Sequence, residues 1–410
     1  MDEAQPSHFE QYGLSAAYDE MFAADTEPRA HYHALFERLR EMRADELQQR
    51  QYAADRAFLN QGITFTVYGD DEGTEKIFPY DLLPRIIPGH EWEVLERGLK
   101  QRITALNLYI KDVYNEGHIL RERVVPRELI RSCKHYRRQM EHVKVPRDVY
   151  VAVVGTDLIR LPDGSFAVLE DNLRVPSGVS YMLANRQVMK QVFPRLLQTT
   201  PVRPNDHYGQ TLLATLRALA PRGRTDPNIV VLTPGVYNSA YFEHAFLARA
   251  MGVTLVEGRD LLVHNNYLYM RDTAGLKRVD VVYRRVDDDF LDPMHFRRDS
   301  QLGVPGLLNV YRSGNVGLAN AIGTGIADDK AIYAFVPQII RYYLGEDTIL
   351  QNVETYLCSD EKQLGHVLAN IETMVVKAVG ESGGYGMLIG QQSTAAQRDE
   401  FRERVRADPR

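Results

Sequence analysis

The sequence has 410 residues, of which 44% are hydrophobic and 25% charged, and its formal net charge is −6. A chain of this length and composition is globular and is expected to bury more than one core. The acidic balance argues against nucleic acid as the main partner, because binding to a phosphate backbone demands a basic excess. The two cysteines, Cys133 and Cys358, form no CxxC pair, which argues against a zinc knuckle or a disulfide framework.

The first residues, MDEAQPSHFEQYG, are polar and acidic. They lack the basic start and apolar middle of a secretion signal, and no stretch of the chain approaches the length of a membrane span. We therefore expect a cytoplasmic protein without a membrane partner.

Residues 28–60 carry apolar positions at helical spacing, which predicts a helical N-terminal segment over residues 1–60 that stops at Gly62. Two short strands are expected on either side of the turn at 69–73. Residues 91–115 then form an amphipathic pattern that ends at Gly117 and predicts a long helix.

Residues 150–172 read as two strands joined by Pro162, Asp163 and Gly164. If Asp163 and Gly164 form a two-residue hairpin loop, Asp157 lies directly across from Glu170. Because side chains alternate along a strand, Glu170 and Asn172 share one face, and Asp171 points to the other.

Two carboxylates opposed in one ladder are unfavourable without a cation. Mg²⁺ is the natural candidate, since it takes one or two carboxylates and leaves its other positions to water and nucleotide phosphates. A solvated strand face, with Arg174 as a surface counter-ion, explains the same residues equally well on spacing alone.

Residues 228–262 have the order strand, glycine-bearing turn, helix, Gly252, strand, which is typical of a βαβ unit, and the linker candidate before it is 220–228. The pattern then becomes mostly helical. Lys330 stands at the start of one helical stretch behind Gly323 and Gly325. Asp328 as a helix cap beside a solvated lysine is the simpler interpretation of that stretch.

The segment MVVKAVGESGGYGMLIG, residues 374–390, places Lys377 on an apolar strand before four glycines. Such a hairpin can lay backbone N–H groups over phosphates while the lysine supplies a positive charge. It is neither a P-loop nor a GxGxxG turn, and a glycine-rich hairpin with a surface lysine is at least as good an interpretation of this segment alone. Together with a magnesium hairpin, a nucleoside triphosphate explains both.

Three stretches, LEDNLRVPSG, NAIGTGIADDK and VVKAVGESGGYG, resemble the circularly permuted ATP-grasp ligases in the branch related to glutathionylspermidine synthase. The acidic strand comes about 200 residues before the glycine loop, the reverse of the ordinary order. The resemblance implies an α/β (α+β) fold: an ATP-grasp part over 61–225 with the acidic hairpin, a Rossmann-like pre-ATP-grasp domain over 226–305, and an ATP-grasp lobe over 306–410, which we expect to be incomplete at its C-terminus.

The resemblance also implies roles for individual residues. It implies Mg²⁺ ligands at Asp157, Glu170 and Asn172, and ATP contacts at Lys330, Lys377, Gly383, Gly384, Tyr385 and Gly386. Substrate contacts are expected at Arg174 and Ser177. Stabilisation of the tetrahedral oxyanion by Arg174 or Arg285 is a hypothesis from the chemistry.

The implied reaction is ATP- and Mg²⁺-dependent. A carboxylate attacks the γ-phosphate to give an acyl phosphate, and an amine then forms an amide, on a peptide-like or amino-acid-like substrate. Relatives also imply a helical companion protein and a transglutaminase-like peptidase as partners. Two alternatives stay open: a non-catalytic nucleotide-binding scaffold with the same fold, and an oxidoreductase, which is disfavoured because no GxGxxG opens the βαβ helix.

Overall fold

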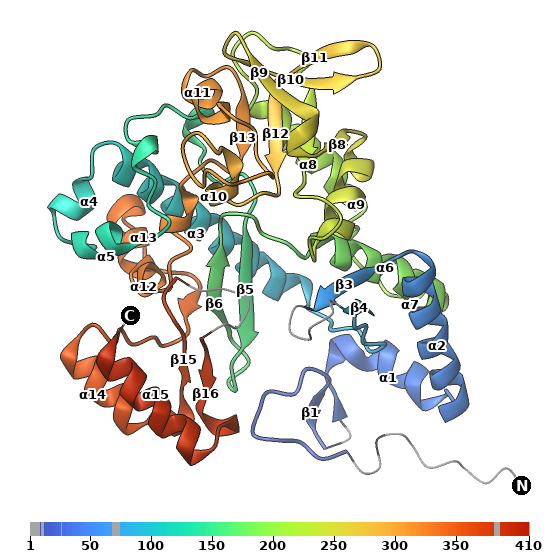
Figure 1. Ribbon diagram of the computed structural model, residues 1–410. Helices are drawn as coiled ribbons and strands as arrows, with labels where there is room; N and C mark the ends of the chain where they lie inside the picture. Colours follow the sequence, from blue (N-terminus) through green and yellow to red (C-terminus); the bar gives the residue numbers. More distant parts are fainter. Residues whose placement is uncertain (1–8, 10–11, 26, 68–73, 381–385, 410) are drawn as a thin grey trace, which may run out of the picture. The chain divides into compact units, whose positions relative to one another are not determined.

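The computed structural model describes residues 9, 12–25, 27–67, 74–380 and 386–409 (Figure 1). The chain forms two compact units, each built from separated segments. Unit 1 comprises Met1–Glu93, Arg160–Ser165 and Val175–Ala319, and unit 2 comprises Val94–Ile159, Phe166–Arg174 and Asn320–Arg410. The boundaries of these two units differ from those of the four domains expected from the sequence. The four-domain division stays a prediction.

Unit 1 contains a four-stranded parallel sheet in the order β13-β12-β7-β8, a three-stranded antiparallel sheet β11-β10-β9, and two short hairpins. Its strands are β1 (Phe22–Ala24), β2 (Glu27–Pro28), β3 (Thr64–Val67), β4 (Thr74–Ile77), β7 (Ile229–Leu232), β8 (Thr254–Val256), β9 (Leu261–His264), β10 (Tyr267–Asp272), β11 (Gly275–Val279), β12 (Val281–Arg284) and β13 (Gly317–Ala319). Its helices are α1 (His33–Arg40), α2 (Ala44–Asn60), α6 (Val179–Val192), α7 (Pro194–Thr199), α8 (Tyr208–Ala218), α9 (Tyr241–Met251), α10 (Asp288–Leu291) and α11 (Leu307–Arg312).

The expected βαβ unit is confirmed, because β7, α9 and β8 follow one another and the two strands pair in parallel. All residues of β7 and β12 are buried, which is typical of central strands of a parallel sheet that is covered on both faces. A second core of unit 1 gathers apolar side chains of α1, α2 and α6, including Leu35, Phe58 and Val188. The predicted helical N-terminal segment contains two helices, α1 and α2, and both are held by packing.

Unit 2 contains the sheet β14-β6-β5, in which β14 (Gln351–Asn352) runs parallel to β6 (Phe166–Asn172) beside β5 (Gly155–Arg160). A short antiparallel pair joins β15 (Val375–Val376) to β16 (Leu388–Ile389). The helices are α3 (Gly89–Tyr114, which begins in unit 1), α4 (His118–Arg121), α5 (Arg127–Ser132), α12 (Lys330–Tyr333), α13 (Val336–Leu344), α14 (Glu361–Ala369) and α15 (Ala395–Ala407).

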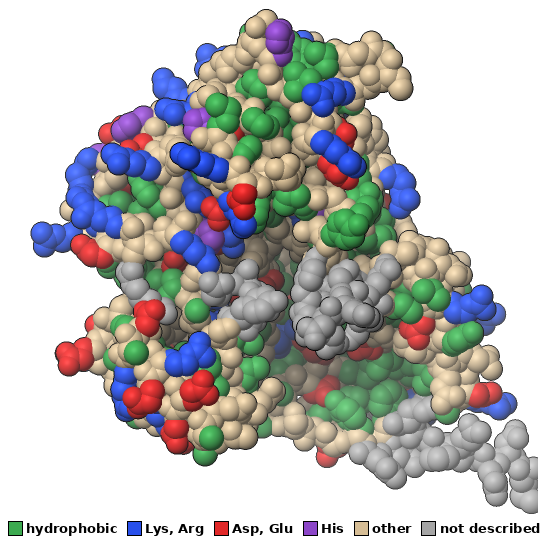
Figure 2. All heavy atoms as spheres, viewed as in Figure 1, with side chains coloured by type: hydrophobic (Ala, Val, Ile, Leu, Met, Phe, Trp, Pro, Cys, Tyr) green, Lys and Arg blue, Asp and Glu red, His purple; other side chains and the backbone are tan. Residues whose placement is uncertain are grey.

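The long helix predicted over 91–115 is α3, which buries residues such as Leu95, Ala105 and Tyr109 along one side. Helices α14 and α15 expose acidic and basic side chains intermixed (Figure 2). Among the described residues, none of the helices combines the length and the apolar character that crossing a membrane requires.

Candidate functional site

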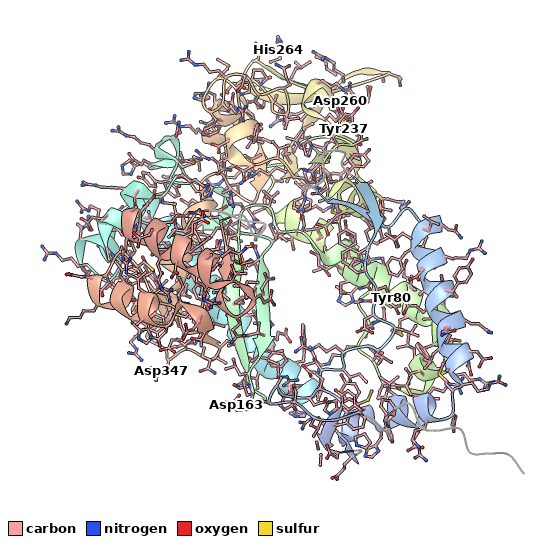
Figure 3. The ribbon with its side chains drawn as sticks, turned by 60° about the horizontal axis from the view of Figure 1, so that its bottom comes forward. Tyr80, Asp163, Tyr237, Asp260, His264 and Asp347 are labelled. Atoms are coloured by element: carbon pink, nitrogen blue, oxygen red, sulfur yellow. The ribbon has the colours of Figure 1, made fainter. Side chains whose placement is uncertain are left out.

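The β5–β6 hairpin closes through a three-residue loop. The backbone N–H of Leu161 donates to the carbonyl of Ser165 at 2.8 Å, and the N–H of Gly164 donates to the carbonyl of Leu161 at 2.9 Å. Gly164 has a φ of +86°, and Asp163 lies at the tip (Figure 3). The two-residue loop predicted from the sequence is therefore wrong, because Pro162 joins the turn and glycine takes the left-handed position after it.

The acidic face of the hairpin nevertheless forms as predicted. The Asp157 carboxyl lies within hydrogen-bonding reach of the side chains of Glu170 and Asn172. Burial raises the pKa of Asp157, the Glu170 carboxylate raises it further, and the hydrogen bond from Asn172 opposes both. The structure thus brings together two carboxylates and one amide, which are hard oxygen donors of the kind that Mg²⁺ prefers.

Asp171 points to the opposite face of β6, as the alternation predicted. Its carboxylate accepts hydrogen bonds from Arg102 Nε at 2.9 and 2.8 Å and from the Thr156 hydroxyl at 3.0 Å. Arg102 also donates to the Asn352 side chain of β14 at 2.7 Å. Because the side chains of Arg102 and Asp171 are each 2% exposed, this ion pair fixes α3, β6 and β14 to one another beneath the acidic face.

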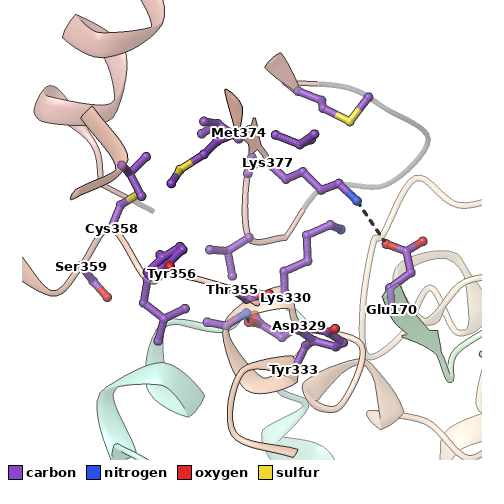
Figure 4. A pocket seen from close by; sticks show the side chains of 18 of the residues that line it. Glu170, Asp329, Lys330, Tyr333, Thr355, Tyr356, Cys358, Ser359, Met374 and Lys377 are labelled. Atoms are coloured by element: carbon purple, nitrogen blue, oxygen red, sulfur yellow. Dashed lines mark hydrogen bonds and ion pairs between the residues drawn. The ribbon is translucent and has the colours of Figure 1, made fainter. Parts of the chain in front are cut away.

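Two lysines come close to Glu170 (Figure 4). Lys377 Nζ lies 4.0 Å from Glu170 Oε2. Lys330 is the first residue of α12, and its backbone N–H donates to the carbonyl of Val379 at 3.3 Å. Burial lowers the pKa of Lys330, Glu170 raises it, and the Lys377 charge lowers it again, so the three side chains act on one another. The structure therefore brings together Lys330, Lys377 and Glu170, which the sequence analysis assigned to one site.

The segment between β15 and β16 is the glycine-rich loop of the sequence analysis. Gly383, Gly384 and Tyr385 lie outside the described residues, and Gly386 is in the left-handed conformation with a φ of +66°. At the start of the loop, a side chain on Gly380 would come within 2.9 Å of Lys134 Cε. Lys134 thus lies against this segment, and the sequence analysis missed it.

A cavity of about 1080 Å³ opens beside these lysines within unit 2. Glu170, Lys330 and Lys377 form a polar part of its wall, and Tyr356, Leu357 and Met374 are among its apolar lining residues. Small-molecule sites combine a mostly apolar wall with a few convergent charged groups in this way. The sequence analysis assigned no residues to this apolar wall, because the segment after β14 carries no motif.

Comparison with known proteins decides the family. The family model described as circularly permuted ATP-grasp type 2 matches residues 84–410. The chain belongs to this family. A glutathione synthetase-like effector of Globodera pallida, solved in its apo form, has a similar fold with a TM-score of 0.57 at 14% identity, over 90% of this chain and 80% of that one.

Relatives at higher identity share most of this permuted ATP-grasp chain. An uncharacterised protein of Synechocystis sp. is 52% identical over 96% of this chain and 82% of its own length, and one of Mycobacterium tuberculosis is 50% identical over 96% and 71%. A Frankia alni protein provisionally named glutamate–cysteine ligase 2-3 is 40% identical over all of this chain and 47% of its own length. The predicted ATP-grasp fold is confirmed, and the finer likeness to glutathionylspermidine synthase in activity stays a prediction.

Arg174 forms an ion pair with Asp328. Its Nε donates to Asp328 Oδ2 at 2.7 Å, and the N–H of Leu173 donates to the other carboxylate oxygen. Burial raises the pKa of Asp328 to about 6 against the opposing charge of Arg174. Asp328 as the helix cap is wrong: Asp329 caps α12 by accepting from the N–H of Ala331 at 2.9 Å. A role for Arg174 at the reacting atoms stays a prediction.

Arg285 and Ser177 belong to unit 1 and contact each other there. The Arg285 guanidinium, whose side chain is 1% exposed, also donates to Glu243 at 2.9 Å and to the carbonyl of Pro176 at 2.6 Å. Glu243 in turn accepts from the N–H of Gly178 at 2.8 Å. These contacts make Arg285 a support of the segment before α6, and its assignment as an oxyanion stabiliser remains untested.

Proposed function

We propose that this protein is an ATP- and Mg²⁺-dependent carboxylate–amine ligase that forms an amide bond through an acyl phosphate. The observation that carries the proposal is the convergence of Lys330, Lys377 and Glu170 on one cavity of unit 2, with Asp157 and Asn172 next to Glu170. Membership of the ATP-grasp family, whose members generally use ATP and Mg²⁺, supports the same conclusion.

The residues divide the work by their charge. Lys330 and Lys377 would place positive charge against the nucleotide phosphates, where negative charge grows as the γ-phosphoryl group moves. Asp157, Glu170 and Asn172 would hold Mg²⁺, which when bound neutralises phosphate charge. Asp171 and Arg102 keep β6 in place, so that Glu170 and Asn172 face the site rather than the core.

The apolar part of the cavity suits a nucleobase. Tyr356 and Leu357 come from the extended segment after β14, and Met374 from the segment before β15. A flat apolar ring system buried there would lie beside Lys330, which also lines the cavity, and would leave the phosphates near Lys330 and Lys377. We assign the adenine to this wall.

The acid and the amine are proposed as peptide-like or amino-acid-like. The name of the Frankia alni relative supports trying glutamate and cysteine first. The resemblance to glutathionylspermidine synthase supports short peptides and polyamines as a second panel. The helical companion protein and the transglutaminase-like peptidase remain expectations from that resemblance.

The proposal is tested by phosphate release from ATP in the presence of Mg²⁺, with panels of amino acids, short peptides and amines. Hydroxylamine added in place of the amine should capture an acyl phosphate as a hydroxamate. Glu170→Ala should abolish both signals, whereas Glu400→Ala, at an exposed position of α15, should keep them.

A scaffold would give a different result. It would bind MgATP and release no phosphate with any pair of substrates, and Glu170→Ala would then have no turnover to remove. Hydroxamate formation without ATP would also contradict the proposed order of steps.

A further inference from the structure

A strongly basic surface lies beside the cavity of unit 2. Residues 121–147 contain nine Lys and Arg residues and three Glu, in a chain whose net charge is −6. Figure 2 shows Lys and Arg side chains gathered over α4 and α5, in contrast to the intermixed charges on α14 and α15. The side chains of Arg123, Arg127, Arg131 and Arg138 are exposed. Among the described residues, these four take part in none of the ion pairs found.

The backbone of this segment is held in unusual conformations. Of the six described residues other than glycine that have a positive φ, three lie here, Arg123 at +61°, His142 at +60° and Arg147 at +55°, and Asp148 at +59° follows directly. Glycine adopts this left-handed conformation readily, whereas it is unfavourable for an arginine because of its Cβ atom. An arginine at such a position is therefore held there by the surrounding structure. Strained positions of this kind gather at functional sites.

The basic surface continues into the cavity. Ser132, at the end of α5, and Lys134 both line the cavity, and Lys134 also lies against Gly380. A molecule that reaches the cavity along α5 would therefore pass the exposed guanidinium groups of Arg127 and Arg131. Guanidinium groups bind carboxylates in a two-pronged geometry, which suits a chain with several acidic side chains.

Two other polyanions fit the surface less well. Single-stranded nucleic acid needs aromatic rings on which bases stack, but Tyr136 is stacked on Tyr114 at 5.3 Å and bonded to Glu141. Binding to a membrane surface is strengthened by apolar side chains that insert, whereas the large apolar residues of this segment, such as Ile130, Met140 and Val143, are buried.

We propose that the basic surface around α5, with Arg123, Arg127 and Arg131, binds an acidic peptide, and that the acid substrate of the ligase is a carboxylate of such a Glu- or Asp-rich chain. The second half of this statement rests on the proposed function. The first half is a binding property of unit 2 that can be measured without ATP.

The test is binding of a fluorescein-labelled oligo-glutamate peptide, followed by fluorescence anisotropy in the absence of ATP. The peptide should bind more tightly than a Gly/Ser peptide of equal length and should dissociate as salt is raised. The variant Arg123→Gln/Arg127→Gln/Arg131→Gln should weaken binding about tenfold, since it removes three exposed charge pairs at once. Thermal unfolding of the variant checks that it is folded.

The matched control, Arg195→Gln/Arg217→Gln/Arg222→Gln, removes the same charge from exposed positions of unit 1 and should bind the peptide as the unchanged protein does. Equal affinity for the two peptides, equal loss in both variants, or tighter binding of single-stranded DNA or of phosphatidylserine vesicles would overturn the proposal. ATP-dependent phosphate release by the unchanged protein reports on the ligase proposal separately. If the protein releases phosphate but does not bind the peptide, the acidic-peptide proposal fails and the ligase proposal stands.

Discussion

His244 gives unit 1 a marked sensitivity to acid. The side chain is buried on α9 and shares a hydrogen bond of 2.8 Å with the Thr233 hydroxyl. Burial, together with the positive charge of Arg285, lowers the pKa of His244 from 6.5 to about 3. The folded protein therefore keeps this histidine neutral where an unfolded chain would protonate it.

The size of the effect follows from the two pKa values. Because the folded pKa lies below the unfolded one, the contribution to stability is complete above pH 6.5 and is lost as the pH falls towards 3. When the pH falls from about 8 to about 5, His244 becomes protonated in the unfolded chain but stays neutral in the folded protein. The free energy of unfolding therefore decreases by about 2 kcal/mol. The figure changes little if the folded pKa is one unit higher, since about pH 5 still lies above it.

The assay is urea unfolding at both pH values for the unchanged protein and for His244→Asn, in which the amide can keep a hydrogen bond to Thr233. Between the two pH values, the free energy of unfolding should fall by about 2 kcal/mol less in the variant than in the unchanged protein. This difference does not depend on how stable the variant is at the higher pH. His207→Asn, at an exposed position of the same unit, is the control and should follow the unchanged protein. An identical pH dependence for His244→Asn and the unchanged protein would refute the reasoning.

Two further predictions concern unit 2. Asp171→Ala should cost about 3–5 kcal/mol of unfolding free energy, because it leaves Arg102 charged and buried without its partner, and chemical denaturation measures the loss. Gly390→Ala should cost about 1–3 kcal/mol, since the new methyl group would lie 1.9 Å from the carbonyl oxygen of Ile371. Gly365→Ala, inside α14 with open space around it, should instead stabilise by up to about 1 kcal/mol. Equal effects of the two glycine substitutions would contradict the packing described for Gly390.

In the acidic hairpin, the alternation of side chains along a strand predicted which face each residue lies on, but not the geometry of the loop. The faces of Glu170 and Asp171 were predictable, because side chains alternate strictly along a strand once it is recognised. The loop was not, since a two-residue and a three-residue turn both accept Pro-Asp-Gly, and only the hydrogen bonds that Leu161 makes with Ser165 and Gly164 distinguish them. The proximity of Asp157 to Glu170 was nonetheless predicted correctly.

Contacts between residues that are far apart in the chain could not be predicted from the sequence. Glu243 and Arg285 meet only when α9 and β12 are in place, and nothing local to either residue signals the pairing. Asp328 and Asp329 are neighbours of the same type, so which one caps α12 depends on backbone geometry alone. Lys134 could have been suspected from the basic run around it, but its contact with Gly380 comes from the tertiary fold.

The central claim is that Lys377 and its neighbours bind MgATP, and the melting temperature of the purified protein tests it most directly. ATP with Mg²⁺, at a concentration about a hundredfold above its Kd, should stabilise the protein by about 2.7 kcal/mol and raise the melting temperature. Lys377→Ala should remove that rise, whereas Lys362→Ala, an exposed lysine of α14, should retain it. An unchanged melting temperature with MgATP, or an equal rise in Lys377→Ala, would contradict the account.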